Sequence, residues 1–184
     1  FNISETLKQS SKILILYVLL TLTIFIVLKI FDLRSLDSFN LAMTLISSGG
    51  FLPTNNLSTI LNTDLKEFVF SICMLTSFFS LFLCYNLIFF KKENINFFQE
   101  DIYLFIYLIF LTILFFLFFS YEYSFTSIFL SLVSSISNIG FSTLENQHNL
   151  TFIYLILTII GGSFFSTSSG LRFIKIYVLF KFAI

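Results

Sequence analysis

Four long apolar segments dominate the chain, at about 11–31, 65–90, 101–120 and 149–184. A helix needs roughly 20 mainly apolar residues to cross a bilayer, so each of the first three segments predicts one membrane span. The fourth segment runs for 36 residues, and the small residues of "GGSFFSTSSG" at 161–170 interrupt it. Because 150–160 and 171–184 are each too short to cross alone, we expect two half-helices joined by irregular backbone. Such backbone is tolerated at membrane depth only where protein or a watery cavity covers it.

Two shorter segments of moderate hydrophobicity lie between these runs. The first is "LDSFNLAMTLISSGGF" at 36–51, and the second is "SFTSIFLSLVSSISNIGF" at 124–141. Each has about a dozen residues before it ends in small residues and Gly-Phe. A helix of that length is too short to span a bilayer. This pattern is typical of a re-entrant half-helix that enters the membrane and returns as a loop.

The two halves of the chain align on each other at an offset of 90 residues without a gap. The Gly-Phe pair at 50–51 falls on the pair at 140–141, and the boundaries of the predicted spans are in phase. We therefore predict a duplicated unit of span, half-helix, loop and span, with one copy at 1–95 and the other at 96–184. Because each unit crosses twice, both copies should have the same orientation.

Composition and charge favour a membrane and give an orientation. The chain is 57% hydrophobic and 11% charged, with zero formal net charge, whereas soluble domains have about 25% charged residues. Lipid is thus the expected surrounding, and there is no basic surface for nucleic acid. Seven basic residues fall on the side of the N-terminus, namely Lys8, Lys12, Lys91, Lys92, Arg172, Lys175 and Lys181, against Lys29, Arg34 and Lys66 on the other. This excess predicts a cytoplasmic N-terminus and 91–100 loop, with both half-helix loops opening outward.

The small residues after each half-helix suit a cation path. A cation that crosses a bilayer needs its hydration shell replaced, and backbone carbonyls can do this without charged side chains. The C-terminal end of a half-helix is partially negative and favours a cation nearby. "SSGG" at 47–50 and "SNIG" at 137–140 supply backbone with few bulky groups. From these residues alone, tight turns in an ordinary helical bundle remain an alternative.

Three stretches together resemble the Trk/Ktr family of potassium uptake proteins. "LISSGGFLPTNN" and "SSISNIGFSTLEN" are similar to the family's second and third filter loops, and "IIGGSFFSTSSGLRFIKIYVLFK" to its broken second span of the third repeat. The order and spacing match over essentially the whole chain. The resemblance implies a pore of four span–half-helix–span repeats, of which this chain holds the second and third. It also implies a homodimer of the full-length parent and a cytoplasmic nucleotide-binding regulatory subunit.

Site residues follow from this resemblance position by position. The filter loops, 47–51 and 137–141, would place backbone carbonyls on the ion path from Ser47, Ser48, Gly49, Gly50, Ser137, Asn138, Ile139 and Gly140. Phe51 and Phe141 would pack behind the filter glycines. The stretch 161–170 matches an intramembrane gate loop, with Gly161, Gly162, Ser166, Thr167 and Gly170 at its matched positions and Arg172 and Lys175 as its basic residues.

The chain departs from the family pattern in the gate-like loop. Phe165, Ser168 and Ser169 stand where the family has glycines, so we expect a stiffer and more occluding loop. Arg172 and Lys175 are three residues apart and would share a helix face. They either reach the cytoplasmic interface or act at the pore, and the sequence leaves both readings open.

The remaining reactive residues indicate no chemistry. Cys73 and Cys84 would lie on one helix face about 16 Å apart, too far for a disulfide, so two buried thiols are expected. His148 is expected in a solvated loop. No nucleophile–base pair, phosphate-binding loop or Cys-Cys motif occurs in the sequence, so we expect no enzyme and no cofactor, with K⁺ as the transported ion.

The sequence thus predicts an all-α integral membrane protein with two tandem repeats, half of a fourfold potassium-channel-like pore. The predicted function is potassium uptake across a bacterial cytoplasmic membrane, either passive or by ion-coupled symport. The alternative is a non-conducting membrane scaffold, a degenerate or truncated relative of such a transporter. Since the chain begins at Phe1 and stops at Ile184 inside an apolar run, we expect it to be a fragment.

Overall fold

The computed structural model describes residues 3–54, 56–81, 83–84, 98–119, 121, 123–142, 151–163 and 165–183. The first half contains helices α1 (Ile3–Ile30), α2 (Ser35–Ser47) and α3 (Asp64–Phe78), with a 3-10 turn at Leu57–Thr59. The second half contains α5 (Phe98–Phe119), α6 (Phe125–Ile136), α7 (Thr151–Ile159) and α8 (Phe173–Ala183). Two residues of β1 (Ile160–Gly161) pair in parallel with two of β2 (Leu171–Arg172).

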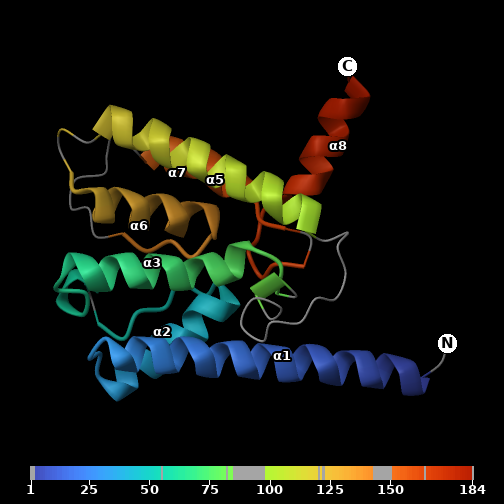
Figure 1. Ribbon diagram of the computed structural model, residues 1–184, viewed down its shortest axis with the longest axis horizontal. Coiled ribbons are helices and arrows are strands. Elements are labelled where there is room, and N and C mark those ends of the chain that lie inside the picture. Colours follow the sequence, from blue (N-terminus) through green and yellow to red (C-terminus); the bar gives the residue numbers. More distant parts are fainter. Residues whose placement is uncertain are drawn as a thin grey trace.

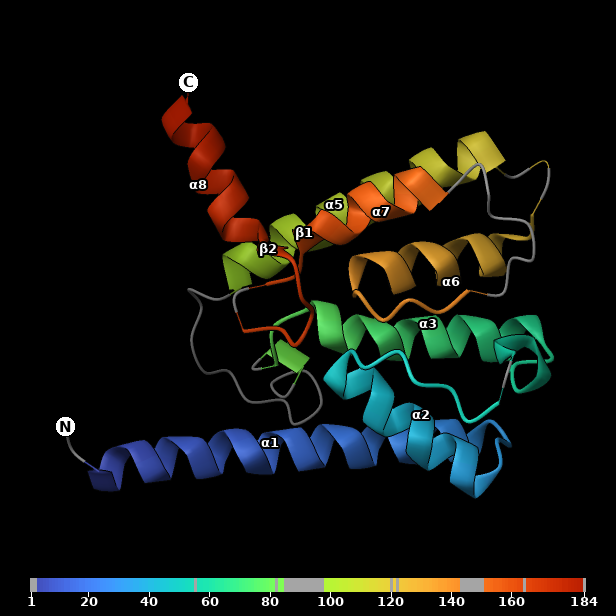
Figure 2. The same ribbon diagram turned by 180° about the vertical axis from the view of Figure 1, so that it is seen from behind.

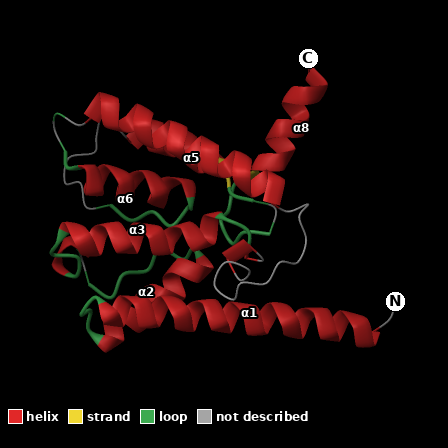
Figure 3. Cartoon of the chain, in the orientation of Figure 1, coloured by secondary structure: helices red, strands yellow, loops and turns green. Residues whose placement is uncertain are grey.

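The helices stack in layers, with each short half-helix between two longer neighbours (Figure 1). The half-helix α2 packs on α1 and α3, and α6 packs on α3, α5 and α7. The colours show that α1 and α5 run in one direction and that α3 and α7 return in the other. From behind, α8 projects away from the layers at the C-terminal end (Figure 2). The described elements are almost all helix (Figure 3).

Among the described residues, two helices are long and apolar enough to cross a membrane. These are Ser10–Ile30 within α1 and Glu100–Phe119 within α5. Large apolar side chains such as Leu22 on α1 and Phe118 on α5 are exposed on their outer faces. Exposed apolar surface on such long helices is what contact with lipid requires.

The core is centred on α6. Every residue from Ile128 to Ile136 is buried, and α3 is the neighbour against which α6 packs most extensively. The rings of Phe68 and Phe129 lie 5.8 Å apart across this contact. The half-helix begins where Ser124 caps it, its side chain accepting from the Ser127 amide. The expected short helices before both loops are therefore present.

One predicted span is wrong in its described part. The segment 65–90 was expected to form a single helix, but α3 ends at Phe78 and Phe79 is extended (φ −78°, ψ 165°). The break is stabilised because its free backbone groups find partners elsewhere. The Ser80 amide donates to Asp101 Oδ1 at 3.2 Å, and the Leu81 amide donates to the Phe165 carbonyl at 3.2 Å.

The break also corrects the placement of the two cysteines. It lies between Cys73 and Cys84, so they do not share one face of one helix. Both are buried and unpaired, as expected. Several sequence predictions fall outside the described residues. These concern residues 82 and 85–90 of that segment, the basic pair at 91–92 and His148.

Candidate functional site

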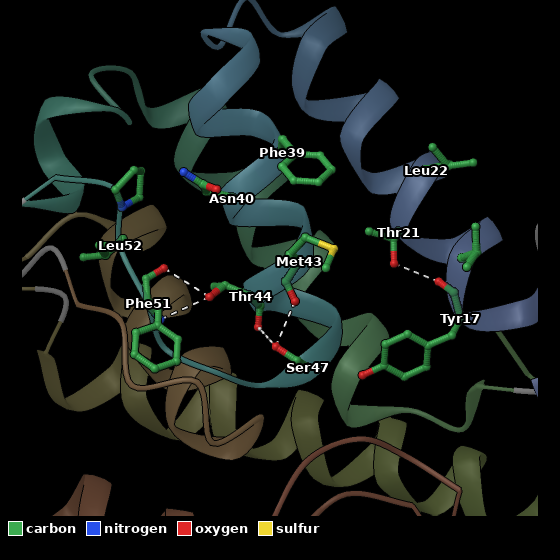
Figure 4. Close-up of a pocket in the computed structure, with 12 residues that line it drawn as sticks. Tyr17, Thr21, Leu22, Phe39, Asn40, Met43, Thr44, Ser47, Phe51 and Leu52 are labelled. Atoms are coloured by element: carbon green, nitrogen blue, oxygen red, sulfur yellow. Dashed lines mark hydrogen bonds between the residues drawn. The ribbon is translucent and has the colours of Figure 1, made fainter. Parts of the chain in front are cut away.

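The first predicted filter loop is a tight return of the chain after α2. Ser48 has a left-handed backbone (φ 50°), and the Gly49 amide donates to the Thr44 carbonyl at 3.0 Å. Thr44 Oγ1 closes the loop, because it accepts from the Phe51 amide and donates to the Phe51 carbonyl, both at 3.1 Å (Figure 4). Gly50 has a φ of 68°, a conformation that glycine adopts without strain.

The second predicted filter loop has the same construction after α6. Asn138 has a left-handed backbone (φ 59°), and Gly140 has a φ of 84°. The Ile139 amide donates to the Ser134 carbonyl at 3.0 Å, and the Phe141 amide donates to Ser134 Oγ at 2.5 Å. Each of these features lies 90 residues after its counterpart in the first loop. The boundaries of the two predicted units nevertheless stay a prediction.

The two loops approach each other closely. A Cβ atom built on Gly50 would lie 2.5 Å from the carbonyl oxygen of Ile139, so a side chain at this position would collide with the other loop. Around Gly140 no atom of the described residues beyond its chain neighbours lies within 4 Å of such a Cβ, so its positive φ is what requires glycine there. The structure thus brings together two predicted site residues from different halves of the chain.

The serines in these loops have different surroundings. Ser47 Oγ donates to the Met43 carbonyl at 2.9 Å, one turn back in α2. Ser137 is fully buried, and its hydroxyl donates to the Ser134 carbonyl at 3.3 Å. Ser48 Oγ is buried with no hydrogen-bond partner among the described residues.

The predicted gate-like loop 161–170 is docked into the break of α3. The Ser163 amide donates to the Phe78 carbonyl at 3.1 Å, and the Ser168 amide donates to the Ser77 carbonyl at 3.0 Å. Gly162 allows this approach, because a Cβ there would overlap the Phe78 carbonyl oxygen. Protein therefore covers the described irregular backbone between α7 and α8, which such backbone would need if it lay at membrane depth.

The serines of this loop hold it together internally. Ser168 Oγ accepts from the Gly162 amide at 2.9 Å, and Ser166 Oγ donates to the Ser163 carbonyl at 2.8 Å. The hydroxyls of Ser166 and Ser168 lie 3.0 Å apart. The serine at 168 thus provides a side-chain acceptor that the family's glycine would lack.

Arg172 points into the same loop rather than along α8. It lies in β2, and its Nη1 donates to the carbonyls of Ser163, Ser166 and Ser168 and to Ser166 Oγ, at 2.9–3.2 Å. Lys175 is exposed on α8. The expectation that these two basic residues share a helix face is therefore wrong, because α8 begins only at Phe173.

Two features were missed from the sequence. The hydroxyls of Thr44 and Ser134 close the two loops, and their alignment at the 90-residue offset could have revealed them. The side chain of Asn138 donates from Nδ2 to the Ser169 carbonyl at 3.0 Å and so connects the second loop to segment 161–170. No local pattern signals a contact between residues 31 positions apart.

A groove lies beside the first loop, between α1, α2 and the residues after Gly50. Its lining includes Tyr17, Phe39, Met43 and Phe51 (Figure 4). Phe51 is 79% exposed, so the expectation that it packs against the protein behind its loop is wrong, whereas its counterpart Phe141 is buried at 4% exposure. Phe141 stacks on Phe70 of α3 at 5.9 Å, whereas no described element covers Phe51 in this way.

Comparison with known proteins identifies the fold. No protein-family model matches the sequence, and none of the curated proteins matches it. A solved structure, that of the potassium transporter TrkH from Vibrio parahaemolyticus, matches with a TM-score of 0.75 at 20% sequence identity. The match covers 97% of this chain and 40% of the TrkH chain. The resemblance drawn from the loop motifs is confirmed at the level of the fold: this chain has the fold of part of the TrkH structure.

Proposed function

We propose that the chain forms part of a potassium uptake path through a membrane, with the loops 47–51 and 137–141 lining its narrowest part. The observation that carries the proposal is the pair of matching loops, each with left-handed backbone at the same two positions and each following a half-helix. Their close approach at Gly50 and Ile139 supports a common path. The fold shared with TrkH makes potassium the first ion to test.

The chemistry of the loops fits a monovalent cation. Residues 47–53 and 137–142 contain no charged side chain, so backbone carbonyls and hydroxyls are the available ligands. Neutral oxygens can replace a hydration shell and still release the ion, whereas dedicated divalent sites use carboxylates. The C-terminal ends of α2 and α6 precede the loops and add partial negative charge.

The path proposed here needs further units beyond this chain. In the second half, α3 covers one face of α6, and Phe129 and Val133 are buried there. The equivalent positions on α2 are Phe39 and Met43, which are 55% and 52% exposed and line the groove. We propose that the second span of another span–half-helix–span unit covers α2 in the way that α3 covers α6.

The orientation and the partners belong to this proposal. The charge distribution supports a cytoplasmic N-terminus and outward-facing filter loops in a bacterial cytoplasmic membrane. A homodimer and a cytoplasmic nucleotide-binding subunit are supported by the family resemblance alone. Passive flow and ion-coupled symport both agree with these residues.

Growth rescue tests the proposed function. The complete coding sequence that contains this chain is expressed in a bacterium that lacks potassium uptake, at low external K⁺. We expect growth and uptake of radioactive Rb⁺ that exceeds uptake of Na⁺. A Gly50→Val variant with equal membrane expression is the matched control and should not rescue, since valine would collide with Ile139. Normal expression without rescue would favour a non-conducting scaffold instead.

A further inference from the structure

The side chain of Asn138 joins two segments that the proposed function treats separately. Its Nδ2 donates to the Ser169 carbonyl at 3.0 Å, from the second filter loop to segment 161–170. Ser169 directly precedes Gly170, whose φ of 91° turns the chain toward β2. The acceptor is a backbone carbonyl, so the amide nitrogen must face it.

Two requirements meet at position 138. The backbone is left-handed, which few residues other than glycine and asparagine adopt readily. The side chain must also reach across to Ser169 with a donor group. The first loop has Ser48 in the same conformation (φ 50°), and its hydroxyl has no hydrogen-bond partner among the described residues. Asparagine at 138 therefore supplies a contact that the left-handed turn itself does not need.

The far end of this contact is a well-anchored segment. Segment 161–170 is hydrogen-bonded to the end of α3 through Ser77 and Phe78, and Arg172 holds three of its carbonyls. Asn138 adds an attachment on the side of the second filter loop. A segment held at both sides stays next to the loop, whereas release of one attachment lets it move away.

We propose that Asn138 is a positioning residue that latches segment 161–170 to the second filter loop and thereby restricts ion flow. The restriction of flow rests on the proposed function, and the latch itself does not. The expected consequence of releasing the latch is a more mobile segment and a higher flux. Because one neutral hydrogen bond is lost, both effects should be about two- to fivefold.

Hydrogen exchange of the complete protein in detergent tests the latch without reference to transport. Asn138→Ser places at 138 the residue that stands at the equivalent position 48, and Asn138→Gly keeps the left-handed backbone unstrained. In both variants we expect the amides of 161–170 to exchange about two- to fivefold faster, since exchange follows the population of the open segment. Asn56→Ser, at an exposed asparagine, is the matched control and should change nothing. Unchanged exchange in both Asn138 variants would overturn the latch.

Uptake measurements test the restriction of flow. In cells with equal expression, Asn138→Ser and Asn138→Gly should raise the initial rate of Rb⁺ uptake above that of the unmodified protein. A double variant, Asn138→Cys with Ser169→Cys, should lose uptake on oxidation and regain it on reduction. Single-cysteine variants control for the native Cys73 and Cys84. Faster exchange with unchanged or lower uptake would overturn the restriction. Absence of uptake by the unmodified protein would overturn the proposed function, and exchange would still decide the latch.

Discussion

Gly50 is the position where a single methyl group should distinguish the two filter loops. Gly50→Ala places a Cβ 2.5 Å from the carbonyl oxygen of Ile139, whereas real Cβ contacts shorter than 3.0 Å essentially never occur. The two loops must therefore separate by about 0.5 Å, the difference between these distances. Gly140→Ala is the matched comparison, because φ is positive there as well but the new Cβ would have no atom within 4 Å from the described residues beyond its chain neighbours.

The expected magnitudes follow from these two environments. A left-handed backbone costs a residue with a Cβ about 1–2 kcal/mol, and this cost applies to both variants. The collision adds about 1–3 kcal/mol for Gly50→Ala alone, as in other overpacked sites. A binding constellation must be held to within about 0.5 Å, so the forced separation should also impair ion discrimination.

Two measurements check this expectation. Thermal unfolding of the complete protein in detergent should show a clearly larger loss of stability for Gly50→Ala than for Gly140→Ala. The ratio of Rb⁺ to Na⁺ uptake, at equal membrane expression, should fall more in the Gly50 variant. The sequence places Gly50 and Gly140 at equivalent positions of the two loops, and the structure ranks Gly50 above Gly140 as the position to test.

The comparison can fail in a definite way. Equal loss of stability in the two variants would show that the loops do not meet at Gly50. A larger loss of discrimination for Gly140→Ala would show that backbone strain, rather than the approach of Gly50 to Ile139, controls the path.

Three further substitutions test other contacts. Arg172→Gln removes a charged donor to the loop 161–170, so the free energy of unfolding should fall by about 1.5–3 kcal/mol. Arg172→Lys keeps the charge but not the guanidinium, so it should lose only part of this stability. Gly162→Ala should detach this loop from Phe78, which faster proteolysis of the loop would reveal; unchanged cleavage would contradict the docking. Ser134→Ala leaves the buried Phe141 amide without its acceptor, at a cost of about 1–3 kcal/mol measurable by thermal unfolding, whereas an unchanged melting temperature would contradict the cap.

The sequence predicts well those features that local chemistry determines. The half-helices α2 and α6 end at small residues, and the glycines at 50 and 140 have the positive φ that no other residue adopts as easily. The interruption at 161–170 is visible because glycine and serine interrupt an apolar run. Each of these signals lies within about a dozen neighbouring residues, which is the range that hydrophobic patterning covers.

Features that depend on distant partners could not be predicted in this way. The segment 65–90 has a continuous helical pattern, and α3 ends inside it because segment 161–170 and Asp101 bind the freed backbone groups. The orientation of Arg172 depends on β2 pairing with β1, which places its guanidinium over the loop instead of along α8. Tertiary contacts override local helix propensity at both places.

Several polar residues of this apolar chain supply hydrogen-bond acceptors where the helices are interrupted. Wherever a helix is interrupted, a backbone amide loses its partner, and membrane surroundings offer no water to replace it. A side chain supplies the acceptor at several such amides, among them Thr44 for Phe51, Ser134 for Phe141, Ser168 for Gly162 and Asp101 for Ser80.

One of these acceptors, Ser168, stands at a position where the resembled Trk/Ktr pattern has a glycine. A glycine loop gains freedom from its missing side chain, whereas Ser168 accepts a hydrogen bond from the Gly162 amide and so binds the backbone of the loop at 161–170. Hydrogen bonds that satisfy a loop internally also resist its movement. We therefore expect the serine at 168 to make the loop at 161–170 stiffer than a glycine would. Asn138 fits this logic, because it attaches the stiffened segment to the loop beside it.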